Sequence, residues 1–457
     1  MAAARVGLVR GPDTLARAAR RLAWVAALTV IGYSVVRGRE LQRSEPRIQL
    51  GAAPLVGRDR ADGWDWRFGW SLVAAAAILG VVVATAHRGW WSSVRGRTLY
   101  ALSGLGAMSF AVALALTDGA DGIRFGVADR HEYLANLPRM PAAGEFVRTF
   151  VDRFDSYSVH VRGHPPGFPL VLQALDAAGL GGVWPVAALQ IAAVGVATTA
   201  VLAAAARIAG DEWMRRAAPF LVVSPYLIWM VSSADAVYTA VGAVGTAAVT
   251  MGVGRLPRAA AAWGLAGGLV LGALLFGTYL GGVFAVLPAT IVVYGAVRRM
   301  PGAAVTALAA VAGAALVVVA FRLAGFWWLD GVRRTNEAYW AGSAHFRPMG
   351  YFLVANLAAA LIAVGPATFA GLTRLRPGRL WILVGGALGA IAISDLSQYT
   401  RAEVERIWLP VYPWVTLAAA GLATEVVRAA VRRPATWWLG AQGGAAILLQ
   451  AALVTKW

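Results

Sequence analysis

Long apolar segments recur from one end of this 457-residue chain to the other and restrict what it can fold into. They run for about 15 to 23 residues, close to the roughly 20 that an α-helix needs to cross a bilayer. The chain is 59% hydrophobic and 14% charged, whereas a soluble domain has roughly 45–50% and 25%. A transmembrane β-barrel would alternate apolar and polar residues instead. The sequence therefore predicts an all-α polytopic membrane protein, a bundle of about 13 transmembrane helices.

Arginine clusters give an independent prediction of topology, because basic residues collect in the cytoplasmic turns of membrane proteins. The predicted spans are 22–36, 70–86, 99–117, 184–206, 217–231, 236–253, 261–276, 283–297, 302–321, 350–370, 380–394, 407–424 and 436–452. The arginines expected inside are Arg17, Arg20, Arg21, Arg88, Arg95, Arg97, Arg207, Arg215, Arg216, Arg255, Arg258, Arg298, Arg299, Arg374, Arg376, Arg379, Arg428, Arg432 and Arg433. This register requires that 166–180 is an interfacial or re-entrant helix. Its one misfit is the outside loop 37–69, with seven arginines.

The remaining composition excludes several classes of function. The net charge of +18 comes almost entirely from arginine, with Lys456 as the sole lysine, and we assign it to topology and to contacts with lipid phosphates, not to nucleic acid. The chain has no cysteine, which excludes disulfides, thiolate metal sites and cysteine nucleophiles. Its inside turns carry no Gly-rich phosphate loop, so a nucleotide-driven cytoplasmic reaction is not expected.

Polar chemistry concentrates in the segments predicted to lie outside. We expect one transmembrane domain, 1–457, with an extracytoplasmic catalytic loop at 118–166 and substrate loops at 322–349 and 395–406. The segment from Thr117 to Gly167 holds seven acidic residues and three histidines. Within it, the apolar spacing of Glu132–Met140 predicts an amphipathic helix on the membrane surface, with Asp129 and Glu132 at its N-terminus. An acid there could be no more than a helix cap.

Two motifs carry a resemblance to a known family. Asp129-x-x-Glu132-Tyr133, followed about thirty residues later by His164-Pro165-Pro166, resembles the first outside loop of the GT-C glycosyltransferases, in particular the protein O-mannosyltransferases and the aminoarabinose transferases. There an Asp-Glu pair leads into an aromatic residue and then a His-Pro-Pro-Leu or Pro-Pro-Leu segment. This chain departs from that pattern at Arg130 and Gly167. The resemblance implies that Asp129 is the catalytic base, with Glu132 and Asp121 as alternatives.

The second motif runs from Arg401 through Arg406 and Pro410 to Pro413 and looks like the Arg-Tyr-Leu-Leu-Pro segment before a late span of the same families. It implies that Arg406, with Arg401, binds the phosphate of a lipid-linked donor. An arginine at the mouth of a helix could equally snorkel to anchor the span. Asp235 stands at an outside helix junction where many GT-C proteins carry an acid, and its alternative is an ordinary N-cap.

Further candidates lie in the outside segments. Arg333 and Arg334 are expected to help hold the donor phosphate. The residues expected to contact substrate are His164, His131, Tyr133, Asp235, Tyr339 and His345. Cations and aromatic rings of this kind suit sugars and phosphates, and they suit the membrane interface equally well. No residue is assigned to a metal, and a divalent ion is left open as a cofactor.

The resemblance implies an inverting glycosyltransferase that takes a sugar such as mannose or arabinofuranose from a polyprenyl-phosphate carrier. Its acceptor would be a cell-envelope glycan, lipid or protein on the outer face of the plasma membrane. A transporter or flippase of a lipid-linked glycan is the rival hypothesis, although such a carrier is expected to hold acids or histidines in mid-span. A third hypothesis is a metal-dependent hydrolase on Asp155, His160 and His164, whose spacing fits no zinc pattern.

Overall fold

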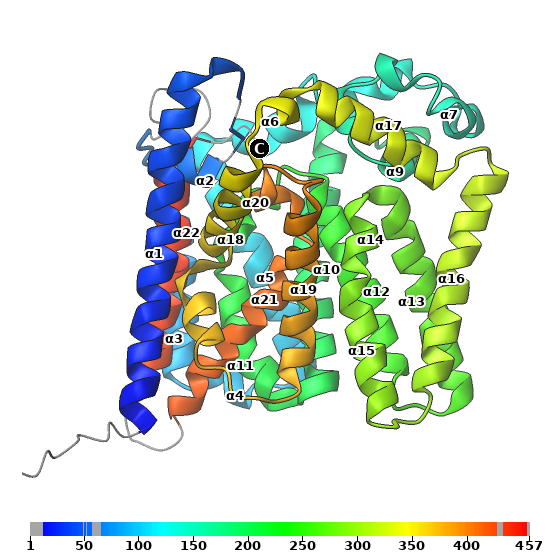
Figure 1. Ribbon diagram of the computed structural model, residues 1–457. Coiled ribbons are helices and arrows are strands. Elements are labelled where there is room, and N and C mark those ends of the chain that lie inside the picture. The colour runs from blue at the N-terminus through cyan, green and yellow to red at the C-terminus, as the bar shows by residue number, and fades with distance from the viewer. Residues whose placement is uncertain (1–11, 49, 52, 57–64, 427–432, 455–457) are drawn as a thin grey trace, which may run out of the picture.

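The computed structural model describes residues 12–48, 50–51, 53–56, 65–426 and 433–454. Every regular element in this part of the chain is a helix, so the all-α prediction is confirmed. Two of the arginines predicted inside, Arg428 and Arg432, lie outside the described residues. The long helices run side by side as a bundle, with short helices at its two ends (Figure 1).

Nine stretches of the described chain are long and apolar enough to cross a membrane. They correspond to α1 (Pro12–Ser44), α3 (Trp70–His87), α5 (Gly96–Ala115), α10 (Val183–Ala209), α13 (Pro257–Gly277), α14 with α15 (Leu280–Phe284, Val286–Val297), α16 (Ala303–Leu323), α18 (Met349–Leu372) and α19 (Leu380–Ser397). A multi-pass membrane protein is therefore confirmed, whereas the number of thirteen spans is not. The other four predicted spans correspond to α11 (Asp211–Val222), α12 (Asp235–Gly252), α21 (Tyr412–Thr416) and α22 (Arg433–Ala452).

Two of those four are interrupted. α11 has 12 residues and gives way to the 3₁₀ helix Pro225–Trp229, and α21 has five residues and continues as the 3₁₀ helix Leu417–Val426. α18 is also broken, at Gly365, which directly precedes Pro366. The φ of Gly365 is 82°, a value that glycine adopts readily and other residues seldom do. Gln442 of α22 satisfies the backbone at this break: its amide oxygen accepts from the Ala367 N–H at 2.8 Å and its amide nitrogen donates to the Val364 carbonyl at 2.7 Å.

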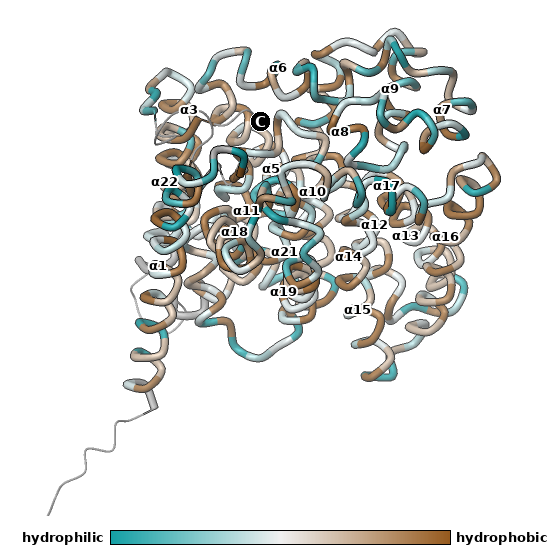
Figure 2. Tube along the Cα trace, turned by 45° about the horizontal axis from the view of Figure 1, so that its top comes forward, coloured by the Kyte–Doolittle hydropathy of each residue, from teal (hydrophilic) through white to brown (hydrophobic). Residues whose placement is uncertain are grey.

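The short helices of the predicted outside loops gather at one end of the bundle (Figure 1). They are α6 (Asp121–Ala128), α7 (Ala143–Thr149), α8 (Val159–Arg162), α9 (Gly167–Ala177), α17 (Trp328–Ala341) and α20 (Val404–Ile407), while α2 (Ala53–Val56) follows α1 and α4 (Trp90–Ser93) follows α3. Hydrophilic residues are frequent around α6, α7 and α8, and the long helices are mainly apolar (Figure 2). At the opposite end, arginines bind helix ends: Arg207 donates to the Val253 carbonyl and Arg215 to the Val94 carbonyl, both at 2.6 Å.

The loop that the sequence singled out differs from its predicted local structure. Glu132–Met140 is not an α-helix; residues Leu134–Arg139 form a 3₁₀ helix that contains Pro138, which cannot donate a backbone hydrogen bond. Asn136 ties this segment to a distant one, because its side chain donates to Ser158 Oγ at 2.6 Å and accepts from the Ser158 N–H at 2.8 Å. Asp129 caps the C-terminus of α6 and so does not begin a helix. α9 has 11 residues, too few to cross a bilayer.

Candidate functional site

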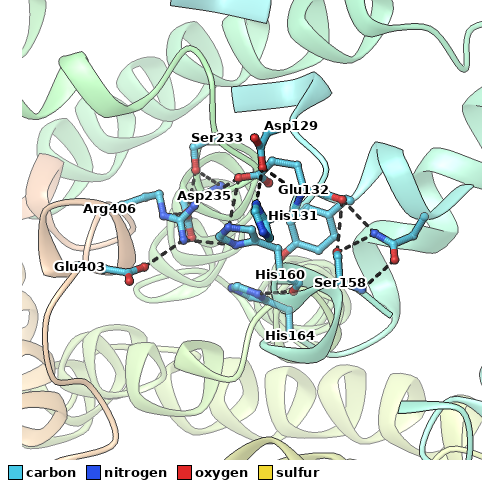
Figure 3. Close-up of polar contacts among 12 residues, drawn as sticks. Asp129, His131, Glu132, Ser158, His160, His164, Ser233, Asp235, Glu403 and Arg406 are labelled. Atoms are coloured by element: carbon cyan, nitrogen blue, oxygen red, sulfur yellow. Dashed lines mark hydrogen bonds and ion pairs between the residues drawn. The ribbon is translucent and has the colours of Figure 1, made fainter. Parts of the chain in front are cut away.

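Arg406 is the centre of a largely buried group of charged side chains (Figure 3). Its helix α20 lies towards the end of the bundle where the short helices gather (Figure 1). Arg406 is 4% exposed. Its Nε lies 3.3 Å from Asp235 Oδ2, its Nη1 3.7 Å from Glu132 Oε1 and its Nη2 3.6 Å from Glu403 Oε2. Nη2 also lies 3.3 Å from Nδ1 of His160, whose Nε2 is 3.3 Å from the same Glu132 oxygen. We name Glu132, His160, Asp235, Glu403 and Arg406 the Arg406 cluster.

The members of the cluster come from four separate stretches of the chain. Glu132 lies in the turn after α6, His160 in α8, Asp235 at the first residue of α12, and Arg406 in α20 with Glu403 directly before it. Asp235 is not acting as an N-cap, because that position belongs to Ala234. Its carboxylate faces Arg406 and accepts a hydrogen bond from Ser233 Oγ at 2.7 Å.

Burial dominates the electrostatics of Glu132. Its removal from water raises the pKa of the carboxyl to about 8; Arg406 acts in the opposite direction, and Asp235, Asp129 and Glu403 add to the rise. For Arg406, burial alone would lower the pKa of the guanidinium, but Asp235, Glu132 and Glu403 outweigh it and raise the pKa. An acid with a pKa near neutrality beside a fixed cation is the arrangement expected of a general acid or base.

Asp129 lies at the rim of the cluster in a different environment. Its Oδ1 is 2.8 Å from His131 Nδ1 and accepts from the His131 backbone N–H at 2.9 Å. Burial alone would raise the pKa of this carboxyl, but the hydrogen bonds from His131 outweigh it and lower the pKa. The Asp129 side chain is 25% exposed, against 9% for Glu132. The two acids of the motif therefore differ in burial and in the direction of their pKa shift.

Aromatic rings lie directly against the cluster. The Tyr238 hydroxyl donates to the Tyr133 hydroxyl at 3.1 Å, and both side chains are buried. His164 stacks on Tyr238 with ring centroids 5.6 Å apart, and Phe168 meets Tyr133 edge to face at 4.9 Å. The His164 Nδ1 donates to the His160 carbonyl at 3.0 Å, and burial lowers the pKa of its imidazole. These rings pack against the charged groups and contribute to the burial of His164.

The segment that carries Glu403 is in a rare backbone conformation. Gln398, Ala402 and Glu403 have φ of 61°, 85° and 59°, in the left-handed region that non-glycine residues seldom adopt. Asn356 of α18 holds the segment: it donates to the Thr400 carbonyl at 2.8 Å and to Asp395 at 2.9 Å, and accepts from the Ala402 N–H at 3.2 Å. Such strain persists only where the surroundings fix it, and it concentrates at functional sites.

Several predicted site residues have other partners. Asp121 is exposed and pairs with Arg124 at 3.6 Å. Arg333 is exposed, and His345 packs its ring against Phe346. Arg401 lies over the Trp340 ring at 4.6 Å, and its backbone N–H donates to the Tyr339 hydroxyl at 2.7 Å.

Arg334, another predicted phosphate ligand, lies in a charged group that is separate from the Arg406 cluster. It pairs with Asp155 at 2.5 Å and with Glu337 at 3.2 Å. Asp155 also has Arg162 at 3.9 Å. We name these four residues the Arg334 cluster.

Two members of the Arg406 cluster were not predicted as substrate-site residues. His160 entered only as a metal ligand of the hydrolase hypothesis, and Glu403 only as part of the second motif. The described residues contain no group of three His, Asp or Glu side chains arranged to hold a metal ion, so Asp155, His160 and His164 do not converge. For Glu403, its place three residues before Arg406, one helical turn away, was a usable signal.

The comparisons with known proteins give a structural likeness but no match by sequence. No family model and no curated protein matches the chain. The structure is similar to the crystal structure of ArnT from Cupriavidus metallidurans in the apo state, with a TM-score of 0.40 and 18% sequence identity, over 64% of this chain and 56% of that one. The chain thus spans little more than half of that protein's length.

Proposed function

We propose that this protein is an inverting membrane glycosyltransferase of the GT-C kind that transfers a sugar from a polyprenyl-phosphate carrier. The acceptor would be a cell-envelope glycan, lipid or protein, and the reaction would take place on the outer face of the plasma membrane. The observation that carries the proposal is the Arg406 cluster: a carboxyl with a pKa of about 8, held beside a buried guanidinium at the loop-bearing end of an apolar bundle.

A single displacement at the anomeric carbon needs a base for the acceptor hydroxyl and a cation for the departing phosphate. Glu132 fits the first role better than Asp129, which the sequence motif ranks first, because a base works best with a pKa near the operating pH. Asp129 pairs with His131 and its pKa is lowered. We therefore propose Glu132 as the base and Asp129 as a rim residue that contacts substrate.

Arg406 is the proposed partner of the carrier phosphate. Its contacts to the three carboxylates, at 3.3, 3.7 and 3.6 Å, are longer than the roughly 2.7–2.9 Å of tight charge-assisted hydrogen bonds. A guanidinium presents five N–H donors in a planar fork, a geometry that suits a phosphate. Burial raises the pKa of Glu132 most, and the neighbouring acids Asp235 and Glu403 add to the rise.

The rival hypothesis of a transporter is disfavoured by where the acids lie. Within the nine candidate spans, the acidic residues are Glu40, Asp118 and Asp395, each within the last five residues of its stretch. A carrier coupled to ions would be expected to keep an acid near mid-span, where its cost persists only for function. The acids of the Arg406 cluster instead lie in loops or at a helix start.

Mass spectrometry of lipid bound to the purified protein, followed by a transfer assay with the lipid found, tests the proposal. We expect a polyprenyl phosphate bearing a pentose or hexose and release of the unsubstituted polyprenyl phosphate on turnover. Glu132→Gln should lower the rate about 10²–10⁴-fold, the usual effect of losing a general base. Asp152→Asn, in an exposed part of the same loop, is the matched control. Transport of an intact lipid-linked glycan without sugar transfer would refute the proposal.

A further inference from the structure

His160 lies between the proposed base and the proposed phosphate ligand. One ring nitrogen, Nδ1, is 3.3 Å from Arg406 Nη2, and the other, Nε2, is 3.3 Å from Glu132 Oε1. The side chain is 13% exposed. Backbone contacts hold the residue at both ends, since its N–H donates to the His131 carbonyl at 3.3 Å and its carbonyl accepts from His164 Nδ1 at 3.0 Å.

The chemistry of the two neighbours decides where the imidazole carries its hydrogen. A guanidinium has N–H donors and no acceptor, so the nitrogen facing Arg406 must offer its lone pair. A neutral imidazole with an acceptor at Nδ1 carries its hydrogen on Nε2, which faces the Glu132 carboxyl. Protonation of Nδ1 would place an N–H against the N–H of Arg406. The geometry therefore selects the neutral Nε2–H form.

We propose that His160 is a positioning residue, fixed by Arg406 as the neutral Nε2–H tautomer so that it donates to Glu132 Oε1 and leaves Oε2 to receive the acceptor's proton. The inference rests on the proposed role of Glu132 in sugar transfer. In that step the acceptor oxygen bonds to the anomeric carbon while its proton passes to Oε2. The bond from the anomeric carbon to the phosphate oxygen breaks, and its electron pair leaves with the phosphate. His160 neither gives nor takes the transferred proton.

The charged groups around His160 come from several elements. Glu132 and Asp129 face it from the turn after α6, Asp235 from the start of α12, and Arg406 with Glu403 from α20 and the residue before it. The four acids would favour an imidazolium at long range, and the direct contact with Arg406 opposes it. The protonation of the two ring nitrogens is an observable property of the folded protein, independent of any transfer assay.

The first test measures this tautomer directly. Nitrogen-15 spectra of the protein labelled at its five histidines, recorded in lipid at pH 7, report the protonation of each ring nitrogen. His160→Gln identifies the signals of His160 by their loss. We expect one protonated nitrogen, Nε2, and an unprotonated Nδ1. An imidazolium or an Nδ1–H tautomer would overturn the inference even if the protein proves to be a transferase.

The second test uses two amides that reach different nitrogens of the ring. In His160→Gln the side-chain N–H₂ can occupy the place of Nε2 and still donate to Glu132, whereas in His160→Asn the shorter amide reaches only the place of Nδ1. Loss of a hydrogen bond to a carboxylate should move the acid limb of the rate–pH profile upward by about 1–2 pH units. We expect this shift for His160→Asn and not for His160→Gln.

Each outcome of the second test bears on the inference. An acid limb that stays in place in His160→Asn contradicts it, as does an equal shift in both variants. A residue that merely packs would lower the yield of folded protein in both variants without moving the limb. If wild-type protein transfers no sugar, the proposed function is wrong. The nitrogen-15 measurement still tests the tautomer of His160, because it does not depend on transfer.

Discussion

The Arg406 cluster, which also contains His160, and the Arg334 cluster differ in burial. Both join an arginine to carboxylates across distant parts of the chain. In the Arg406 cluster, Arg406, Glu132 and Asp235 are 5–9% exposed, His160 is 13% and Glu403 is 28% exposed. In the Arg334 cluster the side chains are 34–70% exposed. Exposed pairs are screened by water and contribute about 0–1 kcal/mol. Buried charges cost several kcal/mol unless partners compensate them, so their retention points to function.

The largest expected effect comes from removing the buried arginine. Arg406→Ala leaves three carboxylates without their shared cation and should lower the free energy of unfolding by about 3–5 kcal/mol. Turnover per folded molecule should also fall, because the phosphate gains charge as the sugar departs. Arg406→Lys should restore turnover only in part, since lysine lacks the planar fork. Thermal unfolding and kcat per folded molecule measure both effects.

Arg334→Ala is the control for that comparison and should change the free energy of unfolding by less than about 1 kcal/mol. An equal loss of stability in the two alanine variants would contradict the distinction between the clusters. Full activity of Arg406→Lys would indicate that Arg406 anchors the helix and does not hold a phosphate.

The second effect concerns the pH dependence of stability. The pKa of Glu132 is raised from 4.5 to about 8 in the folded protein, so the folded state binds this proton more tightly than the unfolded chain does. The stability contributed by protonated Glu132 is present in full below pH 4.5 and is lost as the pH rises through 8. Glutamine does not titrate, so Glu132→Gln does not lose stability in this way as the pH rises. Its melting temperature relative to wild type should therefore rise between pH 4.5 and 8, and a constant difference would contradict the assignment.

The hydropathy of the chain was enough to predict a polytopic helical membrane protein, because spans of ~20 apolar residues follow from the thickness of the bilayer alone. Local detail depended on tertiary contacts. The apolar spacing of Glu132–Met140 fitted an α-helix, but Pro138 and the attachment of Asn136 to Ser158 favour a 3₁₀ helix. The predicted spans at 217–231 and 407–424 are each divided where an α-helix gives way to a 3₁₀ helix.

For the site, the sequence supplied residue types and not burial. Arg334 and Arg406 were predicted together as phosphate ligands, and only the packing of α6, α8, α12 and α20 around Arg406 separates them. His160 was missed because histidine in an acidic loop suggested a metal ligand. Its contact with an arginine depends on two segments far apart in the chain.

A third, smaller effect tests the support of the Arg406 cluster. Asn356→Leu removes three hydrogen bonds that hold the segment before Glu403, and leaving buried polar groups unsatisfied costs about 1–3 kcal/mol. Since that segment carries strain at Ala402 and Glu403, we expect kcat to fall further than the loss of folded protein explains. Hydrogen exchange of residues 398–407 should rise. Unchanged exchange there would show that other contacts fix the segment.

The smallest expected effect lies in the Arg334 cluster itself. A double-mutant cycle of Arg334→Ala and Asp155→Asn should give a coupling free energy of about 1 kcal/mol or less, because both side chains are well exposed and water screens the pair. The coupling should decrease further in high salt, where the Debye length shortens to about 3 Å at 1 M.

The matching cycle of Arg406→Ala and Asp235→Asn should give a larger coupling that salt barely changes, since both side chains are buried. Equal couplings with equal salt dependence would mean that water reaches Arg406 as freely as it reaches Arg334. The case for a water-excluded reaction site around Glu132 would then fail.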